Sequence, residues 1–190
     1  MKVVAFNGSP RRNGNTVKLI EHACRQIEKN GIATELIDIT GQPLRGCTAC
    51  LQCRKNQNLK CAVDTDNMNE YFAKMLSADG IIIGSPTYFA NLTAETKALI
   101  DRCGYIARGN GNPLRRKVGV AIVTMRRAGA INVFNAINDF FLINEMIVPG
   151  SSYWNIGLGR EPGEVEADAE GLKTMETLGE NIAWLLKKLH

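Results

Sequence analysis

The sequence contains only two histidines and no long apolar run. His22 lies inside a predicted helix and His190 ends the chain, and neither belongs to a recognisable catalytic motif. We therefore expect no acid–base dyad. No apolar segment approaches the ~20 residues that a membrane-spanning helix needs, so we also expect no membrane association.

A strong charge of one sign is missing as well. The net charge is +4, and the basic residues form short local pairs rather than a stripe. Nucleic-acid-binding domains concentrate basic side chains on one face, so we expect no nucleic-acid partner. The first residues, MKVVAFNGSP, do not form a signal peptide, and we expect a cytoplasmic location.

The chain has 190 residues, a length that fits one domain with a full core. We expect a single domain over residues 1–190, because no repeat or linker is visible. Strands are predicted at 2–7, 34–39, 80–84 and 117–124, with a fifth starting at 146–149. Helices are predicted at 16–29, 68–77, 93–103, 130–143 and 164–189. This alternation predicts an α/β fold with a doubly wound, five-stranded parallel sheet in the flavodoxin-like order 2-1-3-4-5.

Four of the six cysteines lie close together in the stretch CTACLQCRKNQNLKC: Cys47, Cys50, Cys53 and Cys61. They fall in a segment at about 40–66 without clear periodicity, whereas connections in such folds usually have about two to six residues. A bound metal would order so long a loop. Four thiolates at this spacing favour a [4Fe–4S] cluster.

Other interpretations of these cysteines remain open. Structural zinc usually uses two C-x-x-C pairs separated by a longer loop. Redox-active thiols without a metal, and inert surface thiols, are the remaining alternatives. Cys24 and Cys103 lie on predicted helices away from the run, and we expect both to pack in the core.

Ligands in a sheet of this kind bind at the carboxyl ends of the strands. The first loop there, GSPRRNGNT at 8–16, places small and hydroxyl residues at a helix N-terminus, which attracts anions. Ser9, Asn15 and Thr16 can donate to phosphate oxygens, and Arg11 adds positive charge. The loop fits neither the Walker pattern nor G-x-G-x-x-G. The alternative is a plain polar turn before a capped helix.

Two further loops should reach the same edge of the sheet. After the third strand, Tyr88 and Phe89 offer aromatic surface for a planar ring, although both could simply cover the sheet end. After the fourth strand, Gly129 permits a turn, and Arg126 or Arg127 could face a second anionic ligand.

Three segments carry a family resemblance: Gly8–Arg11 with Gly14–Thr16, then Gly84–Tyr88, then Lys97–Arg102. They resemble the NADPH-dependent FMN reductase group of flavodoxin-like proteins. With the cysteine run included, the chain resembles an iron–sulfur flavoprotein of that group over most of its length.

The resemblance implies a noncovalent FMN and a [4Fe–4S] cluster. The FMN phosphate would bind at Ser9, Arg11, Asn15 and Thr16, and the isoalloxazine along Pro86, Thr87, Tyr88, Phe89 and Asn91, with Thr124 and Gly129 from the third loop. The cluster ligands would be Cys47, Cys50, Cys53 and Cys61. The group assembles as homodimers or homotetramers, and the same is expected here.

The implied activity is an FMN-dependent oxidoreductase. Electrons would pass from NAD(P)H or a ferredoxin-like donor, through FMN and the cluster, to a small acceptor. The cofactors carry this chemistry, so no catalytic residue is assigned. The alternatives are a cluster-free NAD(P)H reductase of flavin or quinones, a flavodoxin-like electron carrier, and a zinc-stapled binding domain.

Overall fold

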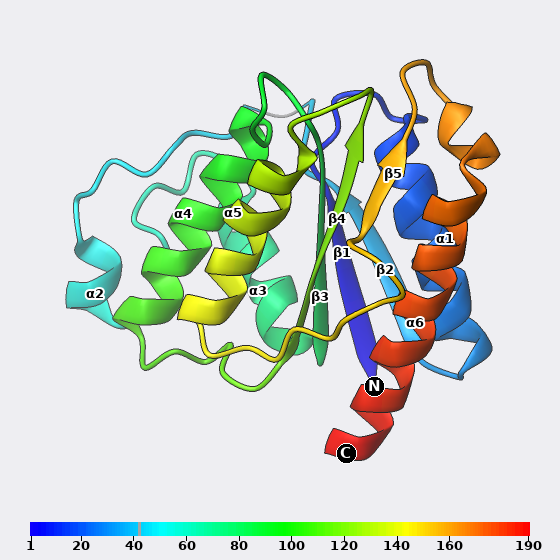
Figure 1. Ribbon diagram of the computed structural model, residues 1–190. Coiled ribbons are helices and arrows are strands. Elements are labelled where there is room, and N and C mark those ends of the chain that lie inside the picture. The colour runs from blue at the N-terminus through cyan, green and yellow to red at the C-terminus, as the bar shows by residue number, and fades with distance from the viewer. Residues whose placement is uncertain (42) are drawn as a thin grey trace.

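A computed structural model describes residues 1–41 and 43–190, so Gln42 in the predicted cysteine loop lies outside the described residues. Its centre is a five-stranded parallel sheet in the order β2-β1-β3-β4-β5 (Figure 1). The strands are β1 Lys2–Asn7, β2 Ala33–Asp38, β3 Gly80–Pro86, β4 Val118–Met125 and β5 Ile156–Leu158. The predicted fold class and strand order are confirmed.

Helices cover both faces of the sheet (Figure 1). They are α1 Asn15–Lys29, α2 Gln52–Asn56, α3 Met68–Ser77, α4 Ala94–Gly109, α5 Ala130–Ile143 and α6 Ala169–Leu189, with a 3-10 turn η1 at Glu164–Ala167. The helices α1 and α6 pack on one face, and α3, α4 and α5 pack on the other. No described helix is both long and apolar enough to cross a bilayer.

The central strands are buried on both faces, which explains their unbroken apolar sequences. In β1, Val3 and Ala5 belong to the core under α1 and α6, while Val4 and Phe6 belong to the core under the other helices. Successive side chains of a strand point to opposite faces, so both sets must be apolar. Burying each such large side chain contributes about 1.5–3 kcal/mol.

The predicted start of the fifth strand at 146–149 is wrong. Ile147 forms only an isolated bridge with Val118 at the beginning of β4. Pro149 follows and has no backbone N–H for a ladder, so the chain leaves the sheet. It returns at Ile156–Leu158, which pairs with Val123–Met125 at the other end of β4.

The helices also differ from the prediction in places. The helix predicted at 93–103 continues to Gly109, and the long predicted C-terminal helix is divided into η1 and α6. Asp168 makes that division because its side chain accepts a hydrogen bond from the Gly171 N–H, at 3.0 Å, and so caps α6. The short α2 inside the cysteine loop was not predicted. Cys24 and Cys103 are buried, as expected.

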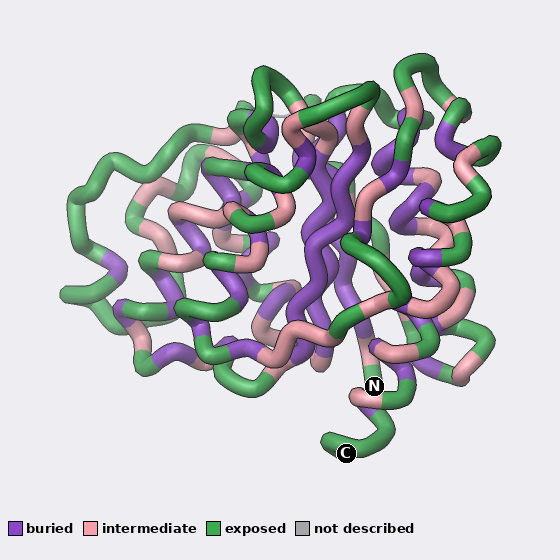
Figure 2. Tube along the Cα trace, in the orientation of Figure 1, coloured by how far each residue is buried: buried purple, intermediate pink, exposed green. Residues whose placement is uncertain are grey.

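All five strands run in the same direction, so their carboxyl ends meet at one edge of the sheet (Figure 1). Figure 2 shows the contrast between the buried strands and the loops at this edge, much of whose surface is exposed. The edge therefore brings together the loops in which the sequence predicts a ligand site.

Candidate functional site

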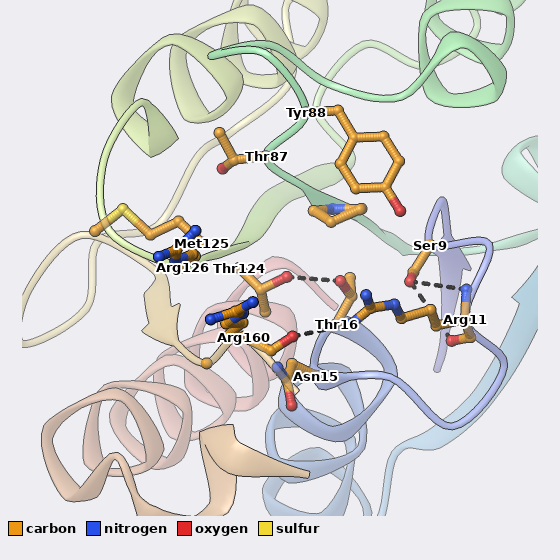
Figure 3. Close-up of a pocket in the computed structure, with 12 residues that line it drawn as sticks. Ser9, Arg11, Asn15, Thr16, Thr87, Tyr88, Thr124, Met125, Arg126 and Arg160 are labelled. Carbon is orange, nitrogen blue, oxygen red and sulfur yellow. Dashed lines mark hydrogen bonds between the residues drawn. The ribbon is translucent and has the colours of Figure 1, made fainter. Parts of the chain in front are cut away.

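A cavity of about 210 Å³ opens among the loops at the carboxyl ends of the strands (Figure 3). The loops β1–α1, β3–α4 and β4–α5 and the segment after β5 contribute its walls. Its lining residues are Ser9, Arg11, Asn15, Thr16, Pro86, Thr87, Tyr88, Thr124, Met125, Arg126, Gly159 and Arg160. Segments distant in sequence thus form one polar and cationic pocket.

The β1–α1 loop gives the pocket its anion-binding character. Gly14 caps α1 without a side-chain hydrogen bond, so the first N–H groups of the helix stay available for a ligand. A Cβ at Gly14 would lie 2.9 Å from Arg11 Cβ, so only glycine fits this tight turn. The helix dipole and the side chains of Arg11, Arg126 and Arg160 together favour a negatively charged group.

Asn15 connects the first loop to the segment after β5. Its Nδ2 donates to the Glu161 carbonyl at 3.0 Å, and its Oδ1 accepts from the Gly163 N–H at 2.8 Å. Arg11 adds a second connection, because Nη1 donates to the Arg160 carbonyl at 2.8 Å. These contacts hold Gly159 and Arg160 at the pocket wall.

The β3–α4 loop makes a tight turn. Tyr88 and Asn91 exchange two backbone hydrogen bonds of 2.8 and 2.9 Å, and Phe89 and Ala90 between them have left-handed φ angles of 47° and 58°. The turn leaves Phe89 fully exposed and directs the Asn91 Oδ1 to the Leu92 N–H. Phe89 and Asn91 therefore do not line the cavity, whereas the half-exposed Tyr88 ring does.

Two threonines from the other loops reach the pocket. The Thr16 and Thr124 hydroxyls lie 2.8 Å apart and join the first turn of α1 to β4. Thr87 donates its N–H to the Thr124 carbonyl at 2.8 Å, but its buried Oγ1 has no partner among the described residues. A buried hydroxyl at a cavity wall is a ready contact for a polar ligand edge.

Gly129 lies outside this cavity and supports its wall from behind. Its φ is +89°, and a Cβ there would lie 2.9 Å from Ala90 Cα and 3.2 Å from Thr87 Cγ2. It lines a neighbouring, more apolar hollow instead, together with Tyr153 and Trp154.

Eight of the eleven residues that the sequence assigned to FMN thus line one cavity, and Phe89, Asn91 and Gly129 do not. Sequence reasoning gave no role to Met125, Gly159 and Arg160, and considered Arg126 only for a second anion. Gly159 and Arg160 follow β5, so the misplaced fifth strand concealed them. Met125 and Arg126 directly follow Thr124, and that adjacency was the available signal.

The four cysteines of the run line a second, smaller pocket beside α4, together with Arg102 and Tyr105. Cys47 and Cys50 are exposed, Cys53 is buried and Cys61 is half-buried, and all four are free thiols. The Ala49 N–H donates to Cys47 Sγ at 3.4 Å. Hydrogen bonds from the Gln52 N–H and then from the Thr48 hydroxyl lower the pKa of the Cys50 thiol.

The backbone of this loop is strained in four places. Ala49, Leu51, Gln57 and Leu59 have φ angles of 54°, 56°, 47° and 61°, in the left-handed region that non-glycine residues rarely adopt. Such conformations cost about 1–3 kcal/mol each and persist where the surrounding structure requires them. Here they turn the chain sharply between successive cysteines.

The chemistry of this pocket fits a thiolate-ligated metal, although its side chains are not yet arranged around a metal. Among residues 1–41 and 43–190, no three His, Cys, Asp or Glu side chains converge as a metal-binding group. Yet four unpaired thiols share one pocket, and backbone N–H groups donate to Cys47 and Cys50, as hydrogen bonds that tune the sulfur ligands of iron–sulfur clusters do.

The helix α4 begins at the first pocket and passes beneath the second. Thr93 caps it, and Thr93 Oγ1 also donates to the Gly8 carbonyl at 2.8 Å. Nine residues along the chain, Arg102 lies against the cysteine loop, where its Nη1 forms an ion pair of 2.5 Å with Asp66. Both pockets are therefore attached to one rigid element.

Comparison with known proteins identifies the family. The NADPH-dependent FMN reductase family matches residues 1–161, a range that holds both pockets. The chain belongs to this family. The resemblance predicted from the sequence is thereby confirmed, and membership supports an oxidoreductase.

Relatives within the family extend over nearly the whole chain. An iron-sulfur flavoprotein of Methanocaldococcus jannaschii is 39% identical over 98% of this chain and 98% of its own length. An iron-sulfur flavoprotein of Methanosarcina thermophila is 33% identical over 98% of this chain and 96% of its own length.

Solved structures resemble the fold at lower identity. RosB, with its bound intermediate 8-demethyl-8-formylriboflavin-5'-phosphate, superposes with a TM-score of 0.77 at 21% identity, over 100% of this chain and 80% of RosB. A flavodoxin from the domain Archaea gives a TM-score of 0.65 at 17% identity, over 98% and 99% of the two chains. These likenesses establish the flavodoxin-like architecture.

Proposed function

We propose that the cavity at the carboxyl edge of the sheet binds FMN. The observation that carries this proposal is the convergence on one pocket of a helix N-terminus, three arginines and a buried Thr87 hydroxyl that has no partner in the described part of the chain. Family membership supports it. When bound, FMN would supply the exchange of one or two electrons, and the protein would position it.

The phosphate end of FMN belongs at the β1–α1 loop. Ser9, the free N–H groups of α1 and the Arg11 guanidinium are the donors that suit a phosphate dianion. Asn15 has a different role in this proposal, because its amide already holds the Glu161–Gly163 segment. It shapes the phosphate site instead of donating to it.

The ring end of FMN belongs along Pro86, Thr87 and Tyr88. The Tyr88 side chain is half-exposed beside the cavity and can cover one face of a planar ring. The Thr87 hydroxyl can satisfy a polar edge. Phe89, Asn91 and Gly129 act on the ring indirectly, since they set the shape of the β3–α4 turn.

We propose further that Cys47, Cys50, Cys53 and Cys61 bind a [4Fe–4S] cluster, which would supply single-electron transfer. The shared pocket, the free thiols and the N–H donors to sulfur support this assignment. The names of the archaeal relatives support it independently.

Together these sites suit an oxidoreductase that moves electrons from NAD(P)H or a ferredoxin-like donor to a small acceptor, in a homodimer or homotetramer. A second candidate is a cluster-free NAD(P)H:flavin or quinone reductase. The incomplete convergence of the thiols among the described residues favours that alternative.

Anaerobic purification separates these candidates. We expect a visible spectrum with flavin and iron–sulfur absorption, about four iron and four sulfide per chain, and oxidation of NADPH or NADH. Cys50→Ser should lose iron and keep FMN. Flavin absorption without iron would support the cluster-free reductase. Failure to oxidise NADPH or NADH would support an electron carrier. Apoprotein that fails to bind FMN would refute the flavin site.

A further inference from the structure

Arg102 is the largest fully buried side chain of the described residues, and it lies under the cysteine loop. Its side chain is 1% exposed. Nη1 donates to the Arg45 carbonyl at 3.0 Å and pairs with Asp66 Oδ2 at 2.5 Å, while Nη2 donates to the Val63 carbonyl at 2.7 Å. The guanidinium thus joins both ends of the segment that carries the four cysteines.

This buried ion pair is not explained by stability alone. Removing two charges from water is costly, and apolar residues of similar volume often replace such a pair without loss. In addition, the Arg102 Nε–H is buried without a partner among the described residues. A donor left unused in so enclosed a place indicates an acceptor that completes the site.

Cys61 is the side chain placed to supply that acceptor. Cys61 and Arg102 line the same small pocket, so the thiol and the guanidinium share one enclosed space. The Cys61 backbone is fixed from the other side, because its N–H donates to Asn69 Oδ1 at 2.7 Å and its carbonyl accepts from Asn69 Nδ2 at 3.1 Å. Cys61 is therefore fixed at the wall of the pocket that Arg102 also lines.

We propose that Arg102 is a positioning residue for the thiolate-ligated metal centre. Its two terminal nitrogens hold the two ends of the loop. Its Nε–H is the donor left available for the Cys61 thiolate once a metal is bound. This inference rests on the proposed cluster. A buried positive charge beside sulfur ligands stabilises the more negatively charged state of the centre, so Arg102 should raise its reduction potential.

The test compares Arg102→Gln and Arg102→Lys with Arg108→Gln. Arg108 lies on the same helix but is half-exposed, and its polar contacts among residues 1–41 and 43–190 are with the Ile143 carbonyl and Glu145. Each protein is purified anaerobically, reconstituted with iron and sulfide, and assayed for iron, sulfide and FMN. The midpoint potential is measured by a redox titration followed by EPR, and hydrogen exchange is measured over residues 45–66.

For Arg102→Gln we expect iron affinity to fall by roughly 10–100-fold, the potential of the remaining centre to become more negative, and the loop to exchange faster. Arg102→Lys keeps the positive charge but loses the two terminal guanidinium nitrogens that bind both ends of the loop. The midpoint potential of the centre should therefore stay near the wild-type value, while the iron affinity falls. FMN content should not change in any variant, and this serves as the folding check.

The possible failures are distinguishable. Wild-type protein that takes up no iron overturns the proposed cluster, and this inference with it. Wild-type protein and Arg102→Gln with equal iron, equal potential and equal exchange overturn this inference alone.

Discussion

The hydroxyls of Thr16 and Thr124 lie 2.8 Å apart at the pocket on the carboxyl edge of the sheet, although they are 108 positions apart in the sequence. Both side chains are buried, so bulk water cannot replace either hydroxyl as a hydrogen-bond partner. The contact joins the first turn of α1 to the end of β4 at the wall of the pocket.

Replacing one of these threonines should cost more than replacing both. Thr16→Val or Thr124→Val leaves the other hydroxyl buried and unpaired, which lowers the free energy of unfolding by about 1–3 kcal/mol. The double variant leaves no unpaired hydroxyl and should recover part of that loss. Urea unfolding of the four proteins measures the coupling, and additive losses would contradict the contact.

Arg11→Gln should separate phosphate binding from ring binding. If Arg11 faces the phosphate, the variant loses FMN affinity by roughly tenfold to a hundredfold, because a charge-assisted hydrogen bond disappears. Riboflavin, which has no phosphate, should bind equally to both proteins. Titration calorimetry measures both ligands. The adjacent Arg12 is exposed and does not line the cavity, so Arg12→Gln is the matched control.

Gly129→Ala should weaken FMN binding through the β3–α4 turn. The new Cβ would press on Ala90 and Thr87, on top of a left-handed strain of about 1–2 kcal/mol. Gly111→Ala is the control, because Gly111 has a φ of +75° and nothing within 4 Å of a Cβ. Both variants should lose similar backbone stability, and only Gly129→Ala should lose FMN affinity. Equal FMN affinity in the two would refute this role.

The Asp66 carboxylate should make the protein sensitive to acid. Burial opposes its ionisation, but hydrogen bonds from Arg102 and from the Arg45 and Met68 N–H groups outweigh that effect and lower the pKa of Asp66. The unfolded chain therefore takes up the proton first. The stabilisation is complete above about pH 4 and is lost as pH falls through the lower folded pKa.

Urea unfolding between about pH 2 and pH 6 tests this expectation. Asp66→Asn should be less stable at neutral pH, by about 3–5 kcal/mol, because Arg102 becomes an unpaired buried cation. Its acid dependence should also be shallower than that of the wild type. Asp64→Asn changes an exposed carboxylate of the same loop and serves as the control. An unchanged acid slope in Asp66→Asn would contradict the assignment.

The sequence predicts the sheet well because its strands are buried on both faces and read as continuous apolar runs. It fails at the fifth strand because Met146–Val148 has the same character, yet Ile147 makes only one bridge before Pro149. The apolar character of a segment does not reveal which segment pairs with the end of β4.

The pocket shows a similar limit. The sequence correctly gathers the loop residues at one edge, since parallel strands dictate where their ends meet. It cannot show that Phe89 turns outward. Phe89 and Ala90 adopt left-handed conformations, and no glycine at these positions indicates such a turn. Nor can the spacing of the cysteines reveal that Arg102, about forty residues further along the chain, lines the second pocket.

The helix α4 has a further consequence for the distance between the two pockets. Thr93 attaches its start to Gly8 in the β1–α1 loop, which lines the first pocket through Ser9 and Arg11, and Arg102 attaches its middle to Asp66 beside the second. Nine residues of α-helix rise about 13–14 Å. The number of helical residues between these two attachment points therefore sets the separation of the proposed flavin and cluster sites within one chain.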